Sequence, residues 1–182
     1  MCKFLSAIVL RNGDILCDPE HTDSHEDLIL ANNLRDSGAL GAGGRDWARI
    51  EFVPPEGGDI SDLDRWTLTL DEDHDKPAWW DESEAIVCER LRDLVRAHIV
   101  DDKRPILLGG WWIVIRTAQI GKVVGAAIKA VRGSASIRNV GDSASIRNVQ
   151  DSASISNVWG SASISNVRGS ATISDDHREV KK

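Results

Sequence analysis

Hydrophobic residues recur at an interval of nine over residues 133–174. With few changes, each copy reads Gly/Asp-Ser-Ala-Ser-Ile-Arg/Ser-Asn-Val-x, so that alanine and isoleucine alternate with two serines. The apolar members are Ala135, Ala144, Ala153, Ala162 and Ala171 together with Ile137, Ile146, Ile155, Ile164 and Ile173. A unit this short cannot bury its own apolar side chains, and it becomes stable only when copies stack on one another. The pattern therefore predicts a repeat architecture.

Alternation within Ser-Ala-Ser-Ile predicts a short strand with alanine and isoleucine on one face and the serines on the other. We interpret Asn-Val-x-Gly as a corner in which asparagine or glycine adopts a positive φ. Two copies then close one coil, and the coils stack about 4.8 Å apart as a thin β-solenoid. The alternative is a meander of hairpins, but antiparallel pairing reverses every second copy and gives identical corners no reason to recur. Aligned side chains of Asn139, Asn148, Asn157 and Asn166 would form ladders along the stack.

The repeat extends toward the amino terminus in a weaker form. The segment 106–115 is rich in β-forming residues, and four later residues anticipate the apolar positions of the clean copies: Ile120, Val123, Ile128 and Val131. At the other end, Asp175 and Asp176 replace the expected asparagine and valine, so the apolar pattern ends in charge as a terminal cap requires. We expect degenerate repeats at 104–132, the solenoid at 133–176 and a charged carboxyl-terminal segment at 177–182.

Residues 1–103 lack this interval and predict a compact α+β domain, which we call the head. Asn12-Gly13 between apolar runs is a strong hairpin signal, because both central residues tolerate positive φ. Alternating polarity predicts two further strands. The expected strands are Lys3–Leu10, Ile15–Cys17, Trp47–Val53 and Arg65–Leu70.

Two helices are expected in the head. The sequence Ser24-His-Glu-Asp resembles a capping box, in which the Ser24 hydroxyl accepts from the amide of Asp27, and predicts a helix over His25–Leu34. Apolar residues spaced three and four apart predict a second helix from Asp81 to about Val100, with His98 near its end. We interpret the glycine-rich run Ser37–Gly44 as a linker.

The net charge of −7 hides an asymmetry between the two parts of the chain. Residues 1–102 hold 24 acidic and 10 basic residues, whereas residues 103–182 hold 5 and 12. An acidic head repels nucleic acid and attracts basic surfaces, including the grooves that bind phosphate in other proteins. The alternative is a solvated surface that keeps the protein soluble. The candidate partner-binding residues are Asp59, Asp62, Asp64, Asp71, Glu72, Asp73, Asp75, Asp81, Glu82 and Glu84.

Cysteine content and hydropathy predict a cytoplasmic protein. The three cysteines are odd in number and widely spaced, which favours reduced thiols over a disulfide framework. The longest apolar stretches are much shorter than the roughly 20 residues that span a bilayer, and the amino terminus lacks a signal-peptide pattern.

Two groups of residues are candidates for ligand chemistry. His21, Asp23, His25 and Glu26 lie close together and can ligate a divalent ion, but the HExxH order is absent and a helix cap with solvated charges explains them without a metal. We therefore expect no cofactor. In residues 103–182, which we call the tail, arginines and a tryptophan could hold the phosphates and base of a small nucleotide at a subunit interface. The tail residues considered for oligomerisation or ligand binding are Trp111, Trp112, Arg116, Arg132, Arg138, Arg147 and Trp159.

The layout of an Asn-Gly hairpin, a Ser-His-Glu-Asp-Leu-Ile helix start, a charged second helix and a near-identical repeat tail resembles small accessory proteins of bacteriophages and mobile elements. The resemblance implies a protein that acts inside a bacterial host by binding a host factor. The leading hypothesis is a non-enzymatic, self-associating inhibitor or adaptor whose acidic head engages a basic host protein. A nucleotide sponge and a metal-dependent enzyme at His21, Asp23 and His25 are the alternatives.

Overall fold

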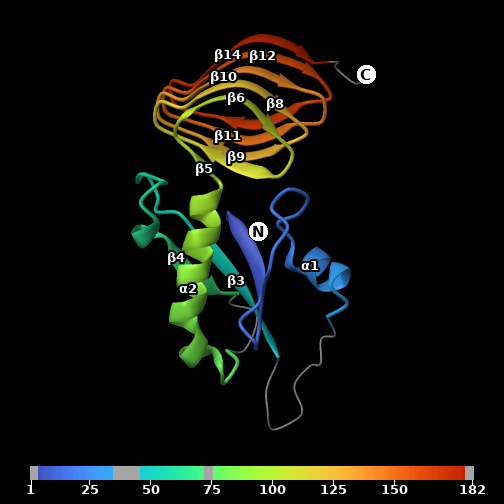
Figure 1. Cartoon of the computed structure of the whole chain (residues 1–182), viewed down its shortest axis with the longest axis vertical. Helices are drawn as coiled ribbons and strands as arrows, with labels where there is room; N and C mark the ends of the chain where they lie inside the picture. The colour runs from blue at the N-terminus through green and yellow to red at the C-terminus, as the bar shows by residue number, and fades with distance from the viewer. Residues whose placement is uncertain (1–3, 35–45, 72–75, 179–182) are drawn as a thin grey trace. The chain divides into compact units, whose positions relative to one another are not determined.

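The computed structural model of the chain describes residues 4–34, 46–71 and 76–178. The chain divides into two compact units, Met1–Ala97 and His98–Lys182. The first unit is built on an antiparallel sheet with helices, and the second is a parallel β-solenoid of about five turns (Figure 1). The expected linker Ser37–Gly44 lies outside the described residues.

The head sheet has the strand order β2-β1-β3-β4, and every neighbouring pair is antiparallel. Its strands are β1 (Leu5–Leu10), β2 (Ile15–Leu16), β3 (Trp47–Val53) and β4 (Thr67–Leu70). The Asn-Gly hairpin is confirmed, with Gly13 at φ 86° and its amide donating to the carbonyl of Leu10 at 2.8 Å. β4 begins two residues later than predicted because Leu63–Arg65 forms the short 3-10 helix η1.

Helix α1 (His25–Ala31) begins as predicted and ends early. The Ser24 hydroxyl accepts from the amide of Asp27 at 3.3 Å, as the capping pattern requires. Asn32 donates its side-chain amide to the Leu28 carbonyl, and Asn33 adopts a left-handed φ of 51°, which stops the helix before Leu34. Leu28 is buried with Ile8 and Trp47 of the sheet.

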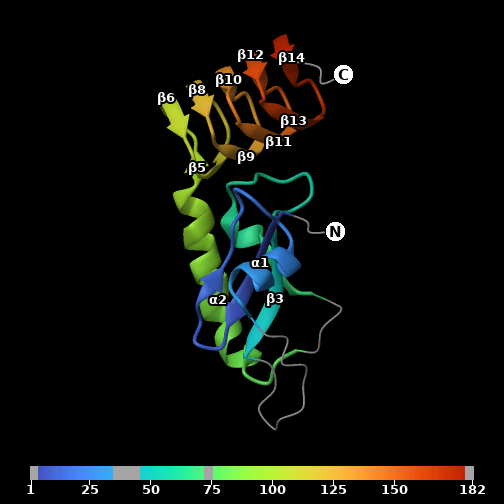
Figure 2. The ribbon, with the colours of Figure 1, turned by 90° about the vertical axis from the view of Figure 1, so that its right-hand side faces the viewer.

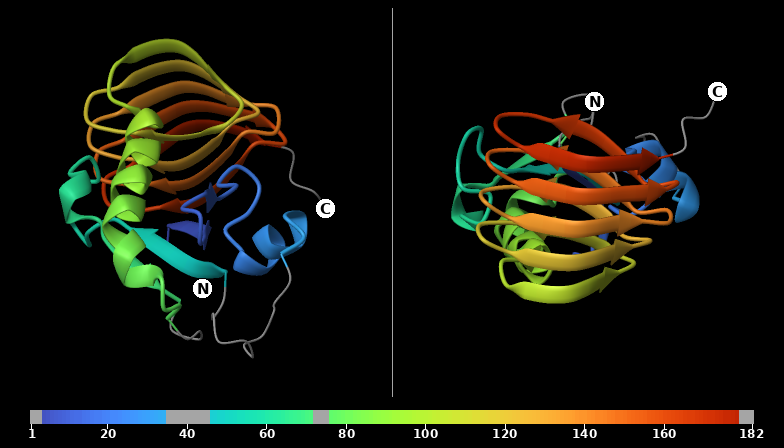
Figure 3. Two further views of the ribbon diagram at one scale, coloured as in Figure 1. Left: turned by 60° about the horizontal axis from the view of Figure 1, so that its bottom comes forward. Right: turned by 90° about the horizontal axis from the view of Figure 1, so that it is seen from above.

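Helix α2 (Trp80–Ala97) runs alongside the sheet (Figures 1 and 3) and buries the predicted apolar stripe of Val87, Leu91 and Val95. The prediction that it continues to Val100 is wrong. Ile99 and Val100 instead form β5 (Ile99–Val100), which pairs in parallel with Ile113 and Val114. At Ile99 and Val100, the backbone pairing of β5 with Ile113 and Val114 stabilises a strand more than the helix propensity of these residues favours a helix.

The solenoid consists of two five-stranded parallel sheets, ordered β6-β8-β10-β12-β14 and β5-β7-β9-β11-β13 (Figure 2). The remaining strands are β6 (Lys103–Leu108), β7 (Trp111–Val114), β8 (Gln119–Val124), β9 (Ala127–Val131), β10 (Ser136–Gly141), β11 (Ser145–Val149), β12 (Ser154–Gly160), β13 (Ser163–Val167) and β14 (Thr172–Arg178). Ile137 pairs with Ile155, and Ile146 pairs with Ile164, so each copy stacks on the second copy after it. The coil of two copies is therefore confirmed, and the hairpin meander is excluded.

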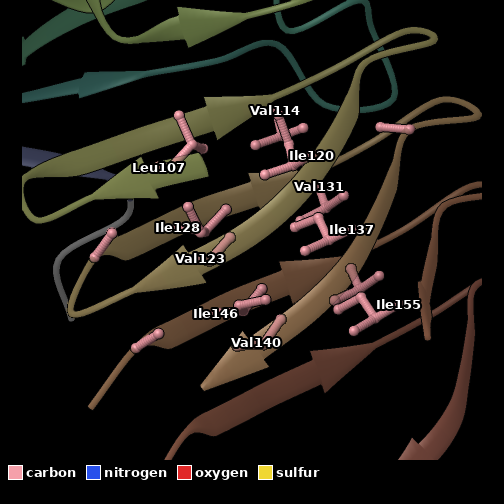
Figure 4. Packing of buried hydrophobic residues seen from close by; sticks show 14 of the residues in the cluster. Leu107, Val114, Ile120, Val123, Ile128, Val131, Ile137, Val140, Ile146 and Ile155 are labelled. Atoms are coloured by element: carbon pink, nitrogen blue, oxygen red, sulfur yellow. The ribbon is translucent and has the colours of Figure 1, made fainter. Parts of the chain in front are cut away.

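Alanine, isoleucine and valine of each copy point into a narrow core (Figure 4). Ala135, Ile137 and Val140 are each 0 % exposed, so three of every nine residues are fully buried in the central turns. The degenerate early turns are also confirmed, because Ile120 and Val123 of β8 pair with Ile137 and Val140. Ile128 and Val131 of β9 occupy the equivalent buried positions in the other sheet.

Of the two residues predicted to adopt a positive φ at the corner, glycine does and asparagine does not. The asparagines lie within strands, and the positive φ occurs at the residue that follows Asn-Val-x, which is the first residue of each copy: Gly133, Asp142, Asp151, Gly160 and Gly169. Aspartate is among the few non-glycine residues that adopt the left-handed region, because its short polar side chain can bond locally. The asparagine amides are used between turns, as Asn139 donates to the Gly121 carbonyl at 3.1 Å and Asn157 donates to Asn139 Oδ1 at 3.1 Å. On the other sheet, Asn166 donates to Asn148 Oδ1 at 3.4 Å, so the predicted asparagine ladders are present on both sheets.

Candidate functional site

The predicted acidic residues occupy two separate clusters on the head. Asp59, Asp62 and Asp64 are exposed around η1. Asp81 and Glu82 are exposed in the first turn of α2, and Glu84 is exposed directly after it. Asp71 is half-buried, and the remaining candidates Glu72, Asp73 and Asp75 lie outside the described residues.

Helix α2 sets the distance between these clusters. Arg92 of α2 faces η1, because its Nε donates to the Leu63 carbonyl at 3.2 Å and lies 3.9 Å from Asp64 Oδ1. Asp81 is three turns earlier on the same helix, a distance of about 16 Å at the helical rise. The acidic surface therefore has two centres.

The two clusters differ in how far their charge is neutralised. At η1, Arg92 contacts both Asp64 and Glu89, and Asp59 accepts from the backbone and hydroxyl of Ser61. At α2, Lys76 pairs with Asp81, whereas Glu82 and Glu84 form no ion pair with any residue in the described ranges. Carboxylates in a first helical turn also favour the positive end of the helix dipole. The α2 cluster nevertheless keeps the more available negative charge.

A buried polar cluster on the head is formed by residues far apart in the chain. His25 is 4 % exposed, and its Nε2 donates to the Ile50 carbonyl at 3.0 Å. Its Nδ1 faces Asp71 Oδ2 at 3.4 Å, and Glu51 Oε1 lies 3.9 Å from Nε2. The Ser6 hydroxyl donates to the same Glu51 oxygen at 3.1 Å. Helix α1, strands β1 and β3, and the end of β4 each supply one part.

This arrangement explains packing better than catalysis. Ser6 donates to Glu51 and not to His25, so the cluster lacks the hydroxyl-to-imidazole hydrogen bond of an activated nucleophile. Within the described part of the chain, no three histidine, cysteine or acidic side chains are placed to hold a metal ion. His21 has a different partner, Asp18, at 2.8 Å. The structure therefore does not assemble the alternative site at His21, Asp23 and His25.

Several ionisable groups on the head are shifted by local contacts. The hydrogen bond to Asp18, together with its charge, raises the pKa of His21 above its ordinary value. A hydrogen bond from its own backbone amide, helped by the Ser24 hydroxyl and the Arg49 charge, lowers the pKa of Glu26. Burial raises the pKa of the Cys88 thiol, which makes it a poor nucleophile at neutral pH.

The solenoid separates the arginines that were considered for nucleotide binding. Arg138 lies on β10 and Arg147 on β11, so they belong to different sheets. Arg116 lies at a corner and pairs with Asp101 at 3.1 Å. Arg132 is half-buried next to another corner. A single site containing all four arginines is therefore not formed within one chain.

The tail tryptophans also have different environments. Trp111 is 6 % exposed and stacks on His98, the residue that follows α2, with ring centroids 4.1 Å apart. Trp112 packs against the solenoid core and donates its Nε1 to the Gly109 carbonyl at 2.9 Å. Trp159 is 37 % exposed. Of the three, Trp159 is the most exposed to a ligand or partner, since Trp112 is partly buried.

Trp159 lies over the neighbouring strand of its sheet. A Cβ atom at Gly141 would come within 2.3 Å of the indole ring, and Lys122 Nζ lies 5.0 Å from the ring centroid. Lys122 was not among the predicted site residues because β8 precedes the clean copies. The sequence could nevertheless have pointed to Lys122. If the coil of two copies is continued one turn toward the amino terminus, Lys122 aligns with Asn139 on the neighbouring strand.

Comparison with protein-family models, with curated protein sequences and with solved structures finds no significant match to this chain. In the described residues, no helix is long and apolar enough to cross a membrane.

Proposed function

We propose that the protein is a non-enzymatic, self-associating binding protein whose acidic head engages a basic surface of another protein. The observation that carries this proposal is the cluster at the start of α2, where exposed Glu82 and Glu84 have no cationic partner among the described residues. A phage-type inhibitor that occupies the nucleic-acid-binding site of a host protein fits this chemistry. Complementary charge would raise the association rate and exclude acidic partners.

Charge reversal at this cluster tests the proposal. We expect Glu82→Lys/Glu84→Lys to weaken binding of the captured basic protein by at least about tenfold, because attraction becomes repulsion. Glu82→Gln/Glu84→Gln should weaken it less. The experiment captures partners from nuclease-treated bacterial lysate, identifies them by mass spectrometry and then measures affinity with the purified partner.

Glu56→Lys is the control for position, because Glu56 is an exposed head acid outside both clusters. It should leave the affinity close to that of the wild type. Equal affinity of the wild type and the reversed variant, or recovery of acidic partners alone, would contradict the proposal.

Self-association is supported by the open last turn of the solenoid. Val167 is 44 % exposed, whereas the equivalent Val140, Val149 and Val158 are 0 % exposed. Ile164 and Ile173 are likewise only partly buried, although Ile137, Ile146 and Ile155 are 0–1 % exposed. Strands β13 and β14 each pair on one side alone within the described chain. A strand edge of this kind pairs readily with another chain, and we propose a second copy as its partner.

Light scattering coupled to size exclusion tests this surface. We expect the full-length protein to form a dimer or larger assembly, and we expect Val167→Asp to shift it toward monomer, because a charge then enters the buried contact. Ser165→Asp is the matched control: it adds the same charge on the same strand at an exposed position and should retain the assembly. A monomeric wild type would refute self-association without affecting the head interaction.

A further inference from the structure

The outer face of the sheet β6-β8-β10-β12-β14 carries an aromatic platform. Trp159 of β12 extends over Gly141 of β10, and three indole atoms lie 2.3–2.8 Å from the position that a Cβ on Gly141 would occupy. The indole therefore rests against the backbone of the neighbouring strand. With Trp159 37 % exposed, part of the ring remains open to solvent. The strands that form this face lie side by side in Figure 3.

Two residues at the variable ninth position of the repeat combine to make this platform. The ninth position of successive copies holds Gly141, Gln150, Trp159 and Arg168. Because one coil contains two copies, the large Trp159 is placed beside the small Gly141 and not beside Gln150. Any larger residue at 141 would push the indole off the sheet. The contact between Trp159 and Gly141 therefore follows from the way the copies stack in a coil of two.

The part of this face formed by β6, β8 and β10 is cationic. Lys103 of β6, Lys122 of β8 and Arg138 of β10 place positive charge on three successive strands, which are about 4.8 Å apart. Strands β6, β8, β10 and β12 contain no aspartate or glutamate, whereas β14 at the edge of the sheet carries the exposed Asp175 and Asp176. Within the described ranges, Lys103 and Arg138 form no ion pair. Their charge is therefore available to an anionic ligand.

We propose that this face binds single-stranded nucleic acid, with a base stacked on Trp159 and phosphates at Lys122 and Arg138. Stacking on an aromatic side chain beside a basic surface is the usual way to hold a single strand without reading its sequence. The cations are spread over three strands of an open sheet, so an extended chain of phosphates can reach all of them. A single nucleotide would reach only those nearest its base.

This binding activity is distinct from the proposed partner site on the head. The head repels phosphate, whereas the tail has an excess of seven positive charges. Contacts with about three cations predict that the logarithm of affinity falls with the logarithm of salt concentration with a slope near −2.

Fluorescence of the full-length protein provides a direct measurement. Trp47, Trp66, Trp79, Trp80 and Trp111 are all at most 8 % exposed, so quenching by an added oligonucleotide reports on Trp159 and on the partly buried Trp112, and the part of the quenching that Trp159→Ala removes belongs to Trp159. We expect a short oligothymidylate of about a dozen nucleotides to quench the fluorescence. Trp159→Ala should weaken binding, measured by anisotropy of a labelled strand, by about tenfold or more.

A matched pair of variants tests the assignment to this face. Arg138 and Arg147 occupy the same position of the repeat on different sheets, so Arg138→Gln should weaken binding severalfold while Arg147→Gln should leave it unchanged. Circular dichroism should show both variants folded. Equal losses in the two variants would overturn the assignment.

Other ligands show whether binding depends on base stacking, on negative charge alone or on a single nucleotide. An abasic strand of equal length should bind more weakly than the oligothymidylate, and polyglutamate should not compete. Binding of the abasic strand or of polyglutamate as tightly as the oligothymidylate would overturn base stacking. Equally tight binding of thymidine monophosphate, or no binding by any of these probes, would overturn the proposal of a nucleic-acid strand. None of these outcomes affects the test of the head.

Discussion

Replacing Ile146 with alanine will lower the free energy of unfolding of the solenoid by about 3 kcal/mol. Ile146 is 1 % exposed and lies in a central turn, with paired turns on both sides. The narrow core offers few side chains that can move into the vacated space, so the cavity will persist. Urea denaturation followed by far-ultraviolet circular dichroism measures the change.

The repeat supplies its own controls. Ile137→Ala and Ile155→Ala should cost about as much as Ile146→Ala, because all three isoleucines are equally buried. Ile164→Ala and Ile173→Ala should cost clearly less, because both side chains are only partly buried in the last turn. The same chemical change is thus made at five equivalent positions, and its cost should follow burial. A uniform cost along the series would show that the last turn is covered in solution, and would favour a stable assembly through that end.

The solenoid was predictable from the sequence because its signal is periodic. The interval of nine and the alternation within each copy were enough to define the inward alanine and isoleucine and the coil of two copies. The strand itself begins at the second serine of each copy and runs through the asparagine and valine, as in β10, and not over Ser-Ala-Ser-Ile. The corner was not predictable from turn propensity alone. Asparagine and glycine both favour a positive φ, and the choice between them depends on the bonds between turns. Asn139 and Asn157 contribute more as ladder donors than as corner residues.

The end of α2 illustrates a different limit. Its apolar spacing continued through His98 and Val100, so the sequence alone favoured a longer helix. Val100 is instead buried in the solenoid and paired with Val114. The apolar spacing of a segment cannot distinguish a helix from a strand when the strand is stabilised by pairing with residues far along the chain, as Val100 is by Val114. The beginning of α1, by contrast, depends on Ser24 and Asp27 alone and was predicted correctly.

The polar cluster around His25 shows why candidate sites in the head were harder to predict. His21, Asp23 and His25 are neighbours in the sequence, and proximity along the chain suggested a shared site. The fold instead gives His25 partners from β3 and from the end of β4, at Ile50 and Asp71. These contacts depend on strand pairing, which no local pattern specifies. The acidic clusters were recognisable from composition, but their separation along α2 required the structure.

The second large effect on stability is expected when His25 is replaced. His25→Ala should lower the free energy of unfolding of the head by about 2–3 kcal/mol, because it removes a buried ring and the donor to the Ile50 carbonyl. His25→Gln should recover part of this loss, since its side-chain amide can donate to the same carbonyl. Urea denaturation monitored by tryptophan fluorescence includes the signal of head unfolding, because the buried Trp47, Trp66, Trp79 and Trp80 belong to the head, and comparison with the wild type isolates the effect of the substitution.

His21→Ala is the matched control, because the two histidines are close in the sequence and differ in burial. His21 is exposed, and its ring bonds to the side chain of neighbouring Asp18, so its removal should produce no measurable change in unfolding. If the two alanine variants were equally stable, the buried contacts of His25 would not stabilise the head. If zinc stabilised the wild type but neither variant, the two histidines would share a metal, and the structural role assigned to His25 would be wrong. A large loss for His25→Ala alone, unaffected by zinc or by a chelator, would establish that this cluster holds α1 on the sheet.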